Sequence, residues 1–321
     1  MYIRKNNILE IIISQKISTI VLSDILLYKY KRYKEKMDNM EINIMEWNIH
    51  QAVNFARQNM PEWIADVILE SNVDIIALTE VYRGNNWESI KKKAFPSNYY
   101  LFETNNEQCG QNDIAIAVNS DKIDVIYTKS FFPQKYEIPD YLEIMCREKE
   151  TNKEFLFVCL RIHDMSKVED RDSKKIKGFS YILENTKNKE NVVICGDFNN
   201  NRRGFEENGR WHLSKIDEMI QQYSFKRKTP EGSSIYEESK GNLDYEFAED
   251  HFFIKGIKDI SLMPYDRSFT EKDKKVYKWD KDFQKYLGKN YEGKNMYESV
   301  PAPFPDHAIL RGTIITDDII L

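Results

Sequence analysis

The sequence predicts an α/β protein in which two packed β-sheets are flanked by helices. Two observations support this fold class. Short apolar or alternating segments typical of strands recur along the chain, and segments of helical length lie between them at irregular intervals. The chain has 321 residues, of which 41% are hydrophobic and 31% charged, so it has an ordinary globular composition and can bury a sizeable core.

The predicted fold starts near residue 40. Residues 42–49 alternate between apolar and polar side chains, which indicates a strand. A helix is expected over 61–72, because Pro61 suits the first turn of a helix. The elements expected next are strands at 73–80, 112–120, 121–132 and 154–163.

The second half continues with a helix over 173–188 and a strand over 191–199, whose apolar run ends in Asp197 and Asn199. A helix over 213–223 and strands at 249–257 and 307–315 complete the expected elements. The composition shifts between the last two strands. We therefore expect an insertion at about 264–304, whose stretch 271–297 interleaves lysines with aromatic residues.

The N-terminal region differs in composition from the rest of the chain. Residues 8–28 are apolar but interrupted by charges, so the uninterrupted run is too short to span a bilayer, and it lacks the cleavage site of a secretory signal. A basic and aromatic run follows at 29–34. We expect residues 1–39 to form a helical appendage outside a catalytic domain over 40–321. Contact of residues 8–36 with a membrane is the alternative.

The charge and the cysteines restrict the function further. The net charge is −5, so a polyanion would have to be held by a local basic patch or by a metal. The cysteines show no paired spacing of metal ligands; they lie at positions 109, 146, 159 and 195. The expected state is therefore reduced core thiols in a cytoplasmic protein.

Polar side chains recur where the predicted strands end or begin. They are Asn48, Glu80, His163, Asp197 with Asn199, Asp250, and Asp306 with His307. One such residue would be explained by the exposure of strand ends to solvent, but six such places on successive strands are harder to dismiss. Brought together, they would supply carboxylates, amides and imidazoles without a nucleophilic Ser or Cys. That set suits a hard divalent cation, with histidines for proton transfer.

The order of these motifs resembles the endonuclease/exonuclease/phosphatase superfamily, which includes DNase I, exonuclease III, neutral sphingomyelinase and the inositol polyphosphate 5-phosphatases. The matching blocks, in order, are MEWNIH, VDIIALTE, CLRIH, CGDFNN, EDHFF and PDHAIL. The likeness covers about residues 40–318. It implies a DNase I-like four-layer sandwich of two mixed sheets flanked by helices, with the site at one end, and a phosphoester hydrolase that uses Mg²⁺ or Mn²⁺.

The resemblance also implies roles for individual residues. Asn48, Glu80 and Asp306 match the metal site, and Glu80 matches its Mg²⁺ ligand. His163 matches the histidine that touches the scissile phosphate. Asp197 and Asn199 match the pair that orients the attacking water and the phosphate, and Asp250 matches the residue that holds the terminal histidine, His307. Which of Asp197 and His307 serves as the base stays open.

The match has departures. Thr79 replaces the usual Gln before the metal-binding Glu, and Pro305 replaces the usual Ser before the terminal Asp-His. Asp244 in NLDY also resembles the block assigned to Asp250, but Asp250 precedes the better apolar strand. No matched catalytic position is substituted, which disfavours a non-catalytic binding module on this fold.

Several sequence features bear on the substrate. His163 argues against the exonuclease III-like branch, which has Tyr there, and the absence of a WCDR-like block argues against the inositol phosphatases. Arg202 and Arg203 beside the catalytic loop could clamp phosphate, or could belong to a solvated basic loop. The Lys and aromatic residues of the insertion suit nucleic acid, a structural flap or a lipid surface. A nuclease is favoured, with a phospholipid or other small phosphoester hydrolase as the alternative.

Overall fold

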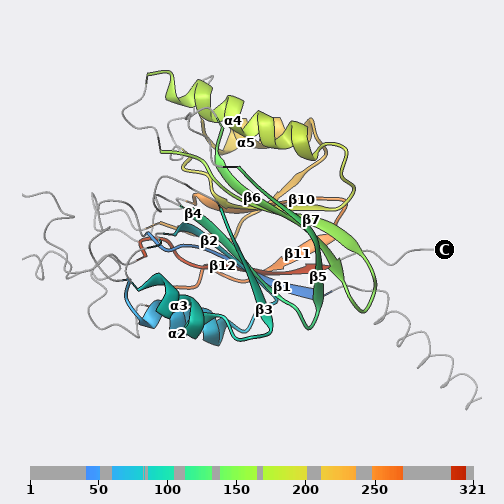
Figure 1. The fold of residues 1–321 in the computed structure, drawn as a ribbon. Helices are drawn as coiled ribbons and strands as arrows, with labels where there is room; N and C mark the ends of the chain where they lie inside the picture. The colour runs from blue at the N-terminus through green and yellow to red at the C-terminus, as the bar shows by residue number, and fades with distance from the viewer. Residues whose placement is uncertain are drawn as a thin grey trace, which may run out of the picture.

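The computed structural model describes residues 41–50, 60–81, 83, 86–104, 113–131, 138–164, 169–200, 211–235, 248–269 and 305–315. These residues form four layers (Figure 1). Two six-stranded sheets pack face to face in the middle. Helices α2 (Trp63–Ser71) and α3 (Trp87–Ala94) cover one side, and α4 (Arg171–Thr186) and α5 (Leu213–Gln221) cover the other. The predicted fold class is thereby confirmed.

The first sheet is mixed, with one parallel pair near its centre. Its strands, in spatial order, are β11 (Asp259–Leu262), β12 (Leu310–Ile315), β1 (Glu41–Asn48), β2 (Ile75–Val81), β4 (Asp113–Asn119) and β3 (Tyr99–Glu103). β1 and β2 run parallel, and every other neighbouring pair is antiparallel. β1 and β2 are almost completely buried, as expected for strands covered on both faces.

The second sheet repeats this plan. Its strands, in spatial order, are β5 (Ile123–Phe131), β6 (Asp140–Glu148), β7 (Glu154–Arg161), β8 (Val192–Asp197), β10 (Asp250–Lys255) and β9 (Lys226–Lys228). β7 and β8 form the parallel pair, and the other neighbours are antiparallel. Each sheet therefore has two central parallel strands whose carboxyl ends lie at the same edge.

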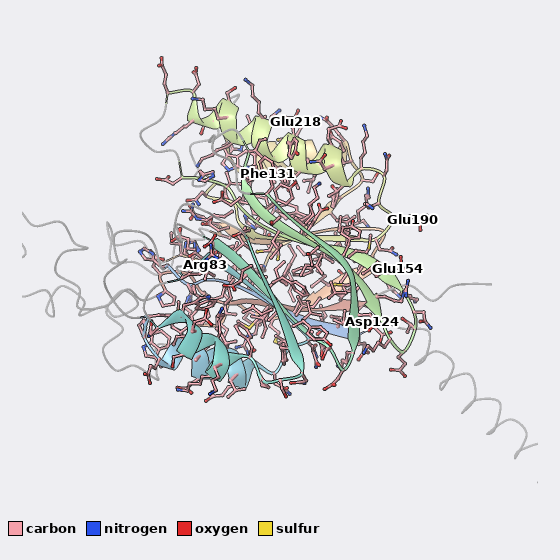
Figure 2. All side chains as sticks on the ribbon, viewed as in Figure 1. Arg83, Asp124, Phe131, Glu154, Glu190 and Glu218 are labelled. Carbon is pink, nitrogen blue, oxygen red and sulfur yellow. The ribbon has the colours of Figure 1, made fainter. Side chains whose placement is uncertain are left out.

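The apolar core divides into two clusters. The larger one fills the space between the sheets and continues beneath α2 and α3, where Trp47 packs against Phe269 at a ring distance of 5.1 Å. The smaller one lies beneath α4 and α5, where Phe179 meets Phe198 edge to face at 5.3 Å. Figure 2 shows side chains filling the space between the layers. Cys159 and Cys195 are fully buried free thiols, as predicted.

Most predicted elements are present, with ends that differ by a few residues. The structure adds α3, β3, β6, β9 and β11, which the sequence pattern does not predict. α3 buries only Trp87, Ile90 and Ala94 among charged neighbours, so its apolar stripe is short. β6 contains both Glu143 and Glu148, and it forms because β5 and β7 pair with it on either side.

Two predicted segments lie outside the described residues: the N-terminal appendage over 1–39, and the insertion beyond Phe269. Among the residues that the structure describes, none of the helices has the length and apolar character needed to cross a bilayer. The stretch 8–36, whose contact with a membrane is the alternative expectation, is not among those residues.

Candidate active site

The topology gathers the polar strand ends at one edge of the two sheets. β1 and β2 are parallel, so Asn48 and Glu80 both lie at that edge. β7 and β8 bring Asp197 to the matching edge of the second sheet. β10 runs antiparallel to β8, so it begins where β8 ends, and Asp250 pairs directly with Asp197. β12 is antiparallel to β1, which places the preceding His307 at the same edge.

Two backbone features shape this edge. Gly196 has a φ of +139°, and a Cβ atom there would lie 1.8 Å from the carbonyl oxygen of Leu160 on β7, so the close approach of β7 and β8 requires glycine. Glu80 has a φ of 53° at an irregularity in the pairing of β2 with β4. Bulges and positive φ values at non-glycine residues often redirect side chains at functional sites.

The carboxylate of Asp197 accepts hydrogen bonds from both Asn48 and Asn199. Its Oδ2 accepts from the side-chain amides of Asn48 at 3.1 Å and Asn199 at 2.8 Å, and its Oδ1 accepts from the backbone N–H of Asn199 at 2.8 Å. Only 1% of its surface is exposed. Burial raises the pKa of Asp197 to about 6, although the nearby His307 works in the opposite direction.

Asp250 holds His307 from the side opposite to Asn48. The Nδ1 of His307 lies 2.8 Å from Oδ2 of Asp250, and its Nε2 lies 3.5 Å from the amide nitrogen of Asn48. Burial alone would lower the pKa of His307, but the charge of Asp250 and its hydrogen bond raise that pKa well above its ordinary value. Within the described part of the chain, Oδ1 of Asp250 has no hydrogen-bond partner.

His50 connects two of the predicted metal-site residues. Its backbone N–H donates to Oδ1 of Asn48 at 3.0 Å, and its ring Nδ1 lies 2.5 Å from Oδ1 of Asp306. The ring and the carboxylate are largely shielded from solvent, since the two side chains are 13% and 12% exposed. His50 therefore belongs to the site, although the sequence indicates only that it lies two residues after Asn48.

Glu80 has a cationic partner that the sequence does not reveal. Arg161, the last residue of β7, places Nη2 2.5 Å and Nε 2.8 Å from Oε1 of Glu80. The same guanidinium lies 3.9 Å from Asp197. Burial, the largest effect, would raise the pKa of Glu80, but the charges of Arg161, His50 and His307 together outweigh it and the pKa is lowered. The sequence pattern treats Arg161 as part of a strand interior, where no partner can be identified.

His163 follows β7 at the same edge, where its ring lies beside a second buried carboxylate. Its Nε2 lies 3.3 Å from Oδ1 of Asp140, the first residue of β6. Asp140 is fully buried. The imidazole is 17% exposed, so it can meet a bound molecule from the solvent side.

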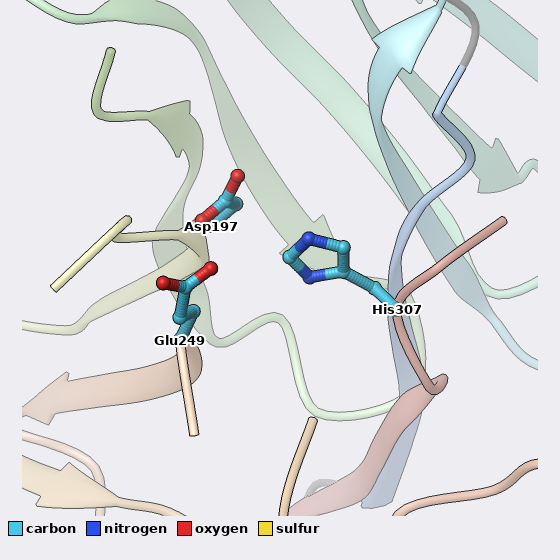
Figure 3. Close-up of side chains that lie close together, drawn as sticks. All are labelled: Asp197, Glu249 and His307. Carbon is cyan, nitrogen blue, oxygen red and sulfur yellow. The ribbon is translucent and has the colours of Figure 1, made fainter. Parts of the chain in front are cut away.

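Glu249 is a second carboxylate that sequence analysis missed. Figure 3 shows its carboxylate beside that of Asp197, with the imidazole of His307 facing both. One ligand atom from each of these three buried residues lies within 4.8 Å of the others. Burial, followed by the charge of Asp197, raises the pKa of Glu249 well above its ordinary value. The sequence signal that could have indicated Glu249 is its position directly before Asp250.

A buried lysine balances part of this negative charge. Lys175 of α4 is 3% exposed, and its Nζ donates to the backbone carbonyl of Asn199 at 2.8 Å. It thereby connects the helix layer to the loop that carries Asn199. Burial lowers the pKa of Lys175, although Asp164, Glu249 and Asp197 favour the charged form.

Thr79, which replaces the usual Gln before the metal-binding Glu, has a hydrogen-bond partner on the neighbouring strand. Its hydroxyl donates to Oε1 of Glu46 at 3.3 Å, and both side chains are fully buried between the sheets. Burial raises the pKa of Glu46 well above its ordinary value, and the charge of Asp250 acts in the same direction. A carboxyl group therefore lies beneath the site at a position that the strand pattern assigns to the core.

The donor set fits a hard divalent cation. Glu80 and Asp306 provide carboxylate oxygens and Asn48 an amide oxygen, which are the ligands that Mg²⁺ and Mn²⁺ favour. The group of Asp197, Glu249 and His307 provides a further set of close ligand atoms. The chemistry of both sets agrees with the predicted cofactor without identifying the ion.

Some predicted residues cannot be placed. Arg202, Arg203 and Asp244 lie outside the described residues. The remaining histidines have structural partners. His212 caps α5 by accepting from the backbone N–H of Lys215 at 3.4 Å. His251 is fully buried and lies 2.8 Å from the hydroxyl of Thr229.

Comparison with known proteins agrees with this geometry. The model of the Endonuclease/Exonuclease/phosphatase family matches residues 45–272. No curated protein matches the chain. Solved structures do. An endonuclease/exonuclease/phosphatase family protein from Bacteroides thetaiotaomicron is 15% identical, with a TM-score of 0.57 over 87% of this chain and 99% of that one.

Two further solved structures are of proteins with a stated activity or ligand. D. rerio TDP2 complexed with a single-strand DNA product is 12% identical, with a TM-score of 0.54 over 85% of this chain and 98% of that one. The mannosyl-6-phosphatase Bt3783 of Bacteroides thetaiotaomicron is 13% identical, with a TM-score of 0.53 over 86% of this chain and 100% of that one. At these identities the likeness shows the fold.

Proposed function

Because the chain belongs to the endonuclease/exonuclease/phosphatase family, whose members hydrolyse phosphoesters, we propose that it is a divalent-metal-dependent phosphodiesterase and that its substrate is a nucleic acid. One observation carries the catalytic part of the proposal. A continuous set of side-chain contacts at one end of the two sheets connects Asn199, Asp197, Asn48, His307 and Asp250. These residues come from strands far apart in the sequence, and strand-end packing alone does not require this combination.

The metal would be held on the side of the first sheet. Glu80, Asp306 and Asn48 offer the oxygen ligands, and an ion bound there neutralises charge on the phosphate and on the leaving group. His50 positions two of these ligands, because it contacts both Asn48 and Asp306. Ligand orientation by neighbouring hydrogen bonds is usual for metal sites.

Asp197 is the residue we assign to the attacking water. Two hydrogen bonds from Asn199 and one from Asn48 hold its carboxylate in place. With a pKa of about 6 it is ionised at neutral pH and can accept a proton from water. Asn199 and Asn48 are neutral, so they orient this carboxylate without repelling an anionic substrate.

His307 is assigned a different role. Asp250 accepts from Nδ1, which leaves Nε2 directed toward Asn48 and the site. Because the raised pKa favours the protonated ring, His307 would donate to a phosphate oxygen rather than take a proton from water. His163 would donate toward the phosphate or the leaving group, held by Asp140 at 3.3 Å.

The choice of nucleic acid as substrate is supported by the comparison with solved structures. TDP2 of D. rerio, which shares this fold, binds a single-strand DNA product. Bt3783 of Bacteroides thetaiotaomicron, which shares this fold, is a mannosyl-6-phosphatase, and a phosphatase acts on a phosphomonoester. A phospholipid or small phosphoester hydrolase is therefore the competing function, and a panel of substrates separates the two.

The test is hydrolysis of plasmid DNA, single-stranded DNA, RNA, sphingomyelin, inositol phosphates and mannose 6-phosphate, each with Mg²⁺ or with EDTA. We expect cleavage of a nucleic acid in Mg²⁺, no turnover in EDTA, and a rate lowered by about 10²-fold or more with Asp197→Asn. Turnover of only a small phosphoester would reassign the substrate and keep the mechanism. No Mg²⁺-dependent turnover of any substrate would favour a binding module.

A further inference from the structure

Arg161 lies between carboxylates of both sheets. In the strand register, Arg161 on β7 lies opposite Asp140 of β6 on one side and opposite Asp197 of β8 on the other. Its guanidinium reaches across to the first sheet and contacts Oε1 of Glu80 with two nitrogens, at 2.5 and 2.8 Å. Arg161 is 8% exposed, so this charge is largely removed from solvent. Glu80 therefore already has a cationic partner fixed in the fold.

A divalent cation would need the same carboxylate. An ion on Glu80 would lie beside the guanidinium, and two cations in a shielded site repel strongly. An arginine does not relieve this repulsion by losing its proton. The ion can therefore bind well only if Arg161 moves away from Glu80 or if a second anion enters the site and compensates the added charge.

The phosphate of a substrate is such an anion. Guanidinium groups bind phosphate oxygens in a bidentate manner, and Asp197, which lies 3.9 Å from Nε of Arg161, already belongs to the proposed reaction centre. We propose that Arg161 couples the binding of the metal to the binding of the phosphate: it competes with the ion for Glu80, and it contacts the phosphate when both are bound. This inference rests on the proposed metal-dependent function.

The coupling is reciprocal by thermodynamic linkage. If phosphate strengthens the binding of the metal by some factor, the metal strengthens the binding of phosphate by the same factor. Such an arrangement would keep the ion weakly bound until a substrate arrives. Arg161 would then contact the substrate and set the affinity of the site for the metal. No other arginine contacts Glu80 within the described ranges.

Asp140 offers the competing explanation. It is fully buried, and its side-chain oxygens accept no hydrogen bond within the part of the chain that is described. Arg161 could turn to Asp140 when a metal takes Glu80. In that case the affinity for the metal would not depend on phosphate, so the two explanations predict different binding data.

The experiment measures binding of Mn²⁺ to the full chain by electron paramagnetic resonance, with and without inorganic phosphate. Titrations without protein correct for complexes between Mn²⁺ and phosphate. For the wild-type chain we expect phosphate to tighten Mn²⁺ binding by about tenfold, within the usual range of coupling between sites. Equal affinity in the two conditions would overturn the inference, and this comparison requires no variant.

Variants assign the effect to the guanidinium. Arg161→Met should bind Mn²⁺ more tightly than wild type without phosphate, and phosphate should no longer strengthen it. Arg161→Lys keeps a charge but not the planar fork, so it should retain part of the coupling. Arg147→Met is the matched control, because Arg147 is 43% exposed and pairs with Glu154 far from the site. Unchanged coupling in Arg161→Met would overturn the inference.

Folding and metal binding are checked separately. Circular dichroism and thermal unfolding establish that each variant is folded. If Arg161→Met does not fold, Arg161→Lys and the wild-type comparison still decide the matter. Glu80→Gln should weaken Mn²⁺ binding relative to wild type in both conditions, because it removes a charged ligand. Absence of a Glu80-dependent Mn²⁺ site in the wild type would reject the metal dependence of the proposed function, whereas a site without coupling would reject only the inference.

Discussion

Asp250 and His307 are 57 residues apart in the sequence, yet their side chains meet at 2.8 Å in the buried floor of the site. The contact forms because β10 begins at the edge where β8 ends, and because the segment before β12 returns to the same edge beside β1. Both side chains are almost fully buried, so removing the charge of Asp250 should strongly change the pKa of His307.

Replacing Asp250 with Asn should lower both activity and the pKa of His307. The carboxylate is the largest of the charges that raise this pKa against the effect of burial, ahead of Asp197 and Asp306. Its loss should reduce kcat by about 10²-fold, the usual scale for lost acid–base or electrostatic help. NMR titration of His307 measures the pKa directly. An unchanged pKa in this variant would show that the pair does not control the protonation of the ring.

The same pair predicts how stability depends on pH. The pKa of His307 is raised in the folded state, so the pair contributes fully below the unfolded pKa of about 6.5, and the contribution is lost as the pH rises through the folded value. Asp250→Asn should therefore cost more stability at about pH 6 than at about pH 9. Urea unfolding of both proteins at the two pH values measures the difference. A loss of stability that is larger at about pH 9 than at about pH 6 would contradict this prediction.

Activity should fall as the pH is lowered through the pKa of Asp197. Burial raises this pKa to about 6, and we propose that the ionised carboxylate acts on the water. The profile of kcat/KM against pH should show a limb near this value, and Asp197→Asn should be slower than wild type by about 10²-fold or more. Asp217→Asn on α5, whose partner is Arg227, is the control and should keep the wild-type profile. A flat profile through this range would remove Asp197 from the role of base.

Turnover should require a divalent metal held by Glu80. EDTA should abolish hydrolysis, and Mg²⁺ or Mn²⁺ should restore it. Glu80→Gln should raise the metal concentration needed for half-maximal rate, because it removes a charged ligand. Glu154→Gln is the surface control, since Glu154 pairs with the exposed Arg147. Full turnover in EDTA would rule out the metal-assisted mechanism.

Gly196→Ala should destabilise the fold far more than Gly232→Ala. Both glycines have a positive φ, at 139° and 97°. A Cβ atom at 196 would overlap the carbonyl of Leu160, whereas a Cβ atom at 232 would meet nothing within 4 Å. We expect a loss of about 3 kcal/mol or more for the first and about 1 kcal/mol for the second, by chemical denaturation. Equal losses in the two variants would show that the positive φ, and not the overlap with Leu160, determines the loss of stability.

The positions at the ends of strands could be predicted from the sequence because the signal is local. An apolar run that stops at Asn48 or Asp197 marks both a buried strand and the polar group that follows it. The order of six such blocks was enough to indicate the family and the four-layer arrangement, which the structure and the family model confirm. The proposed roles of the residues remain predictions.

The sequence by itself therefore determined the fold class, the family and the candidate residues at the strand ends. Only the tertiary structure showed Arg161 on Glu80, Glu249 beside Asp197, and Lys175 beneath the loop. Arg161 and Glu80 belong to different sheets, and they meet only when the sheets pack face to face. The partner of a buried charge depends on that packing, because a strand's own periodicity specifies the face to which a side chain points and not what lies opposite it.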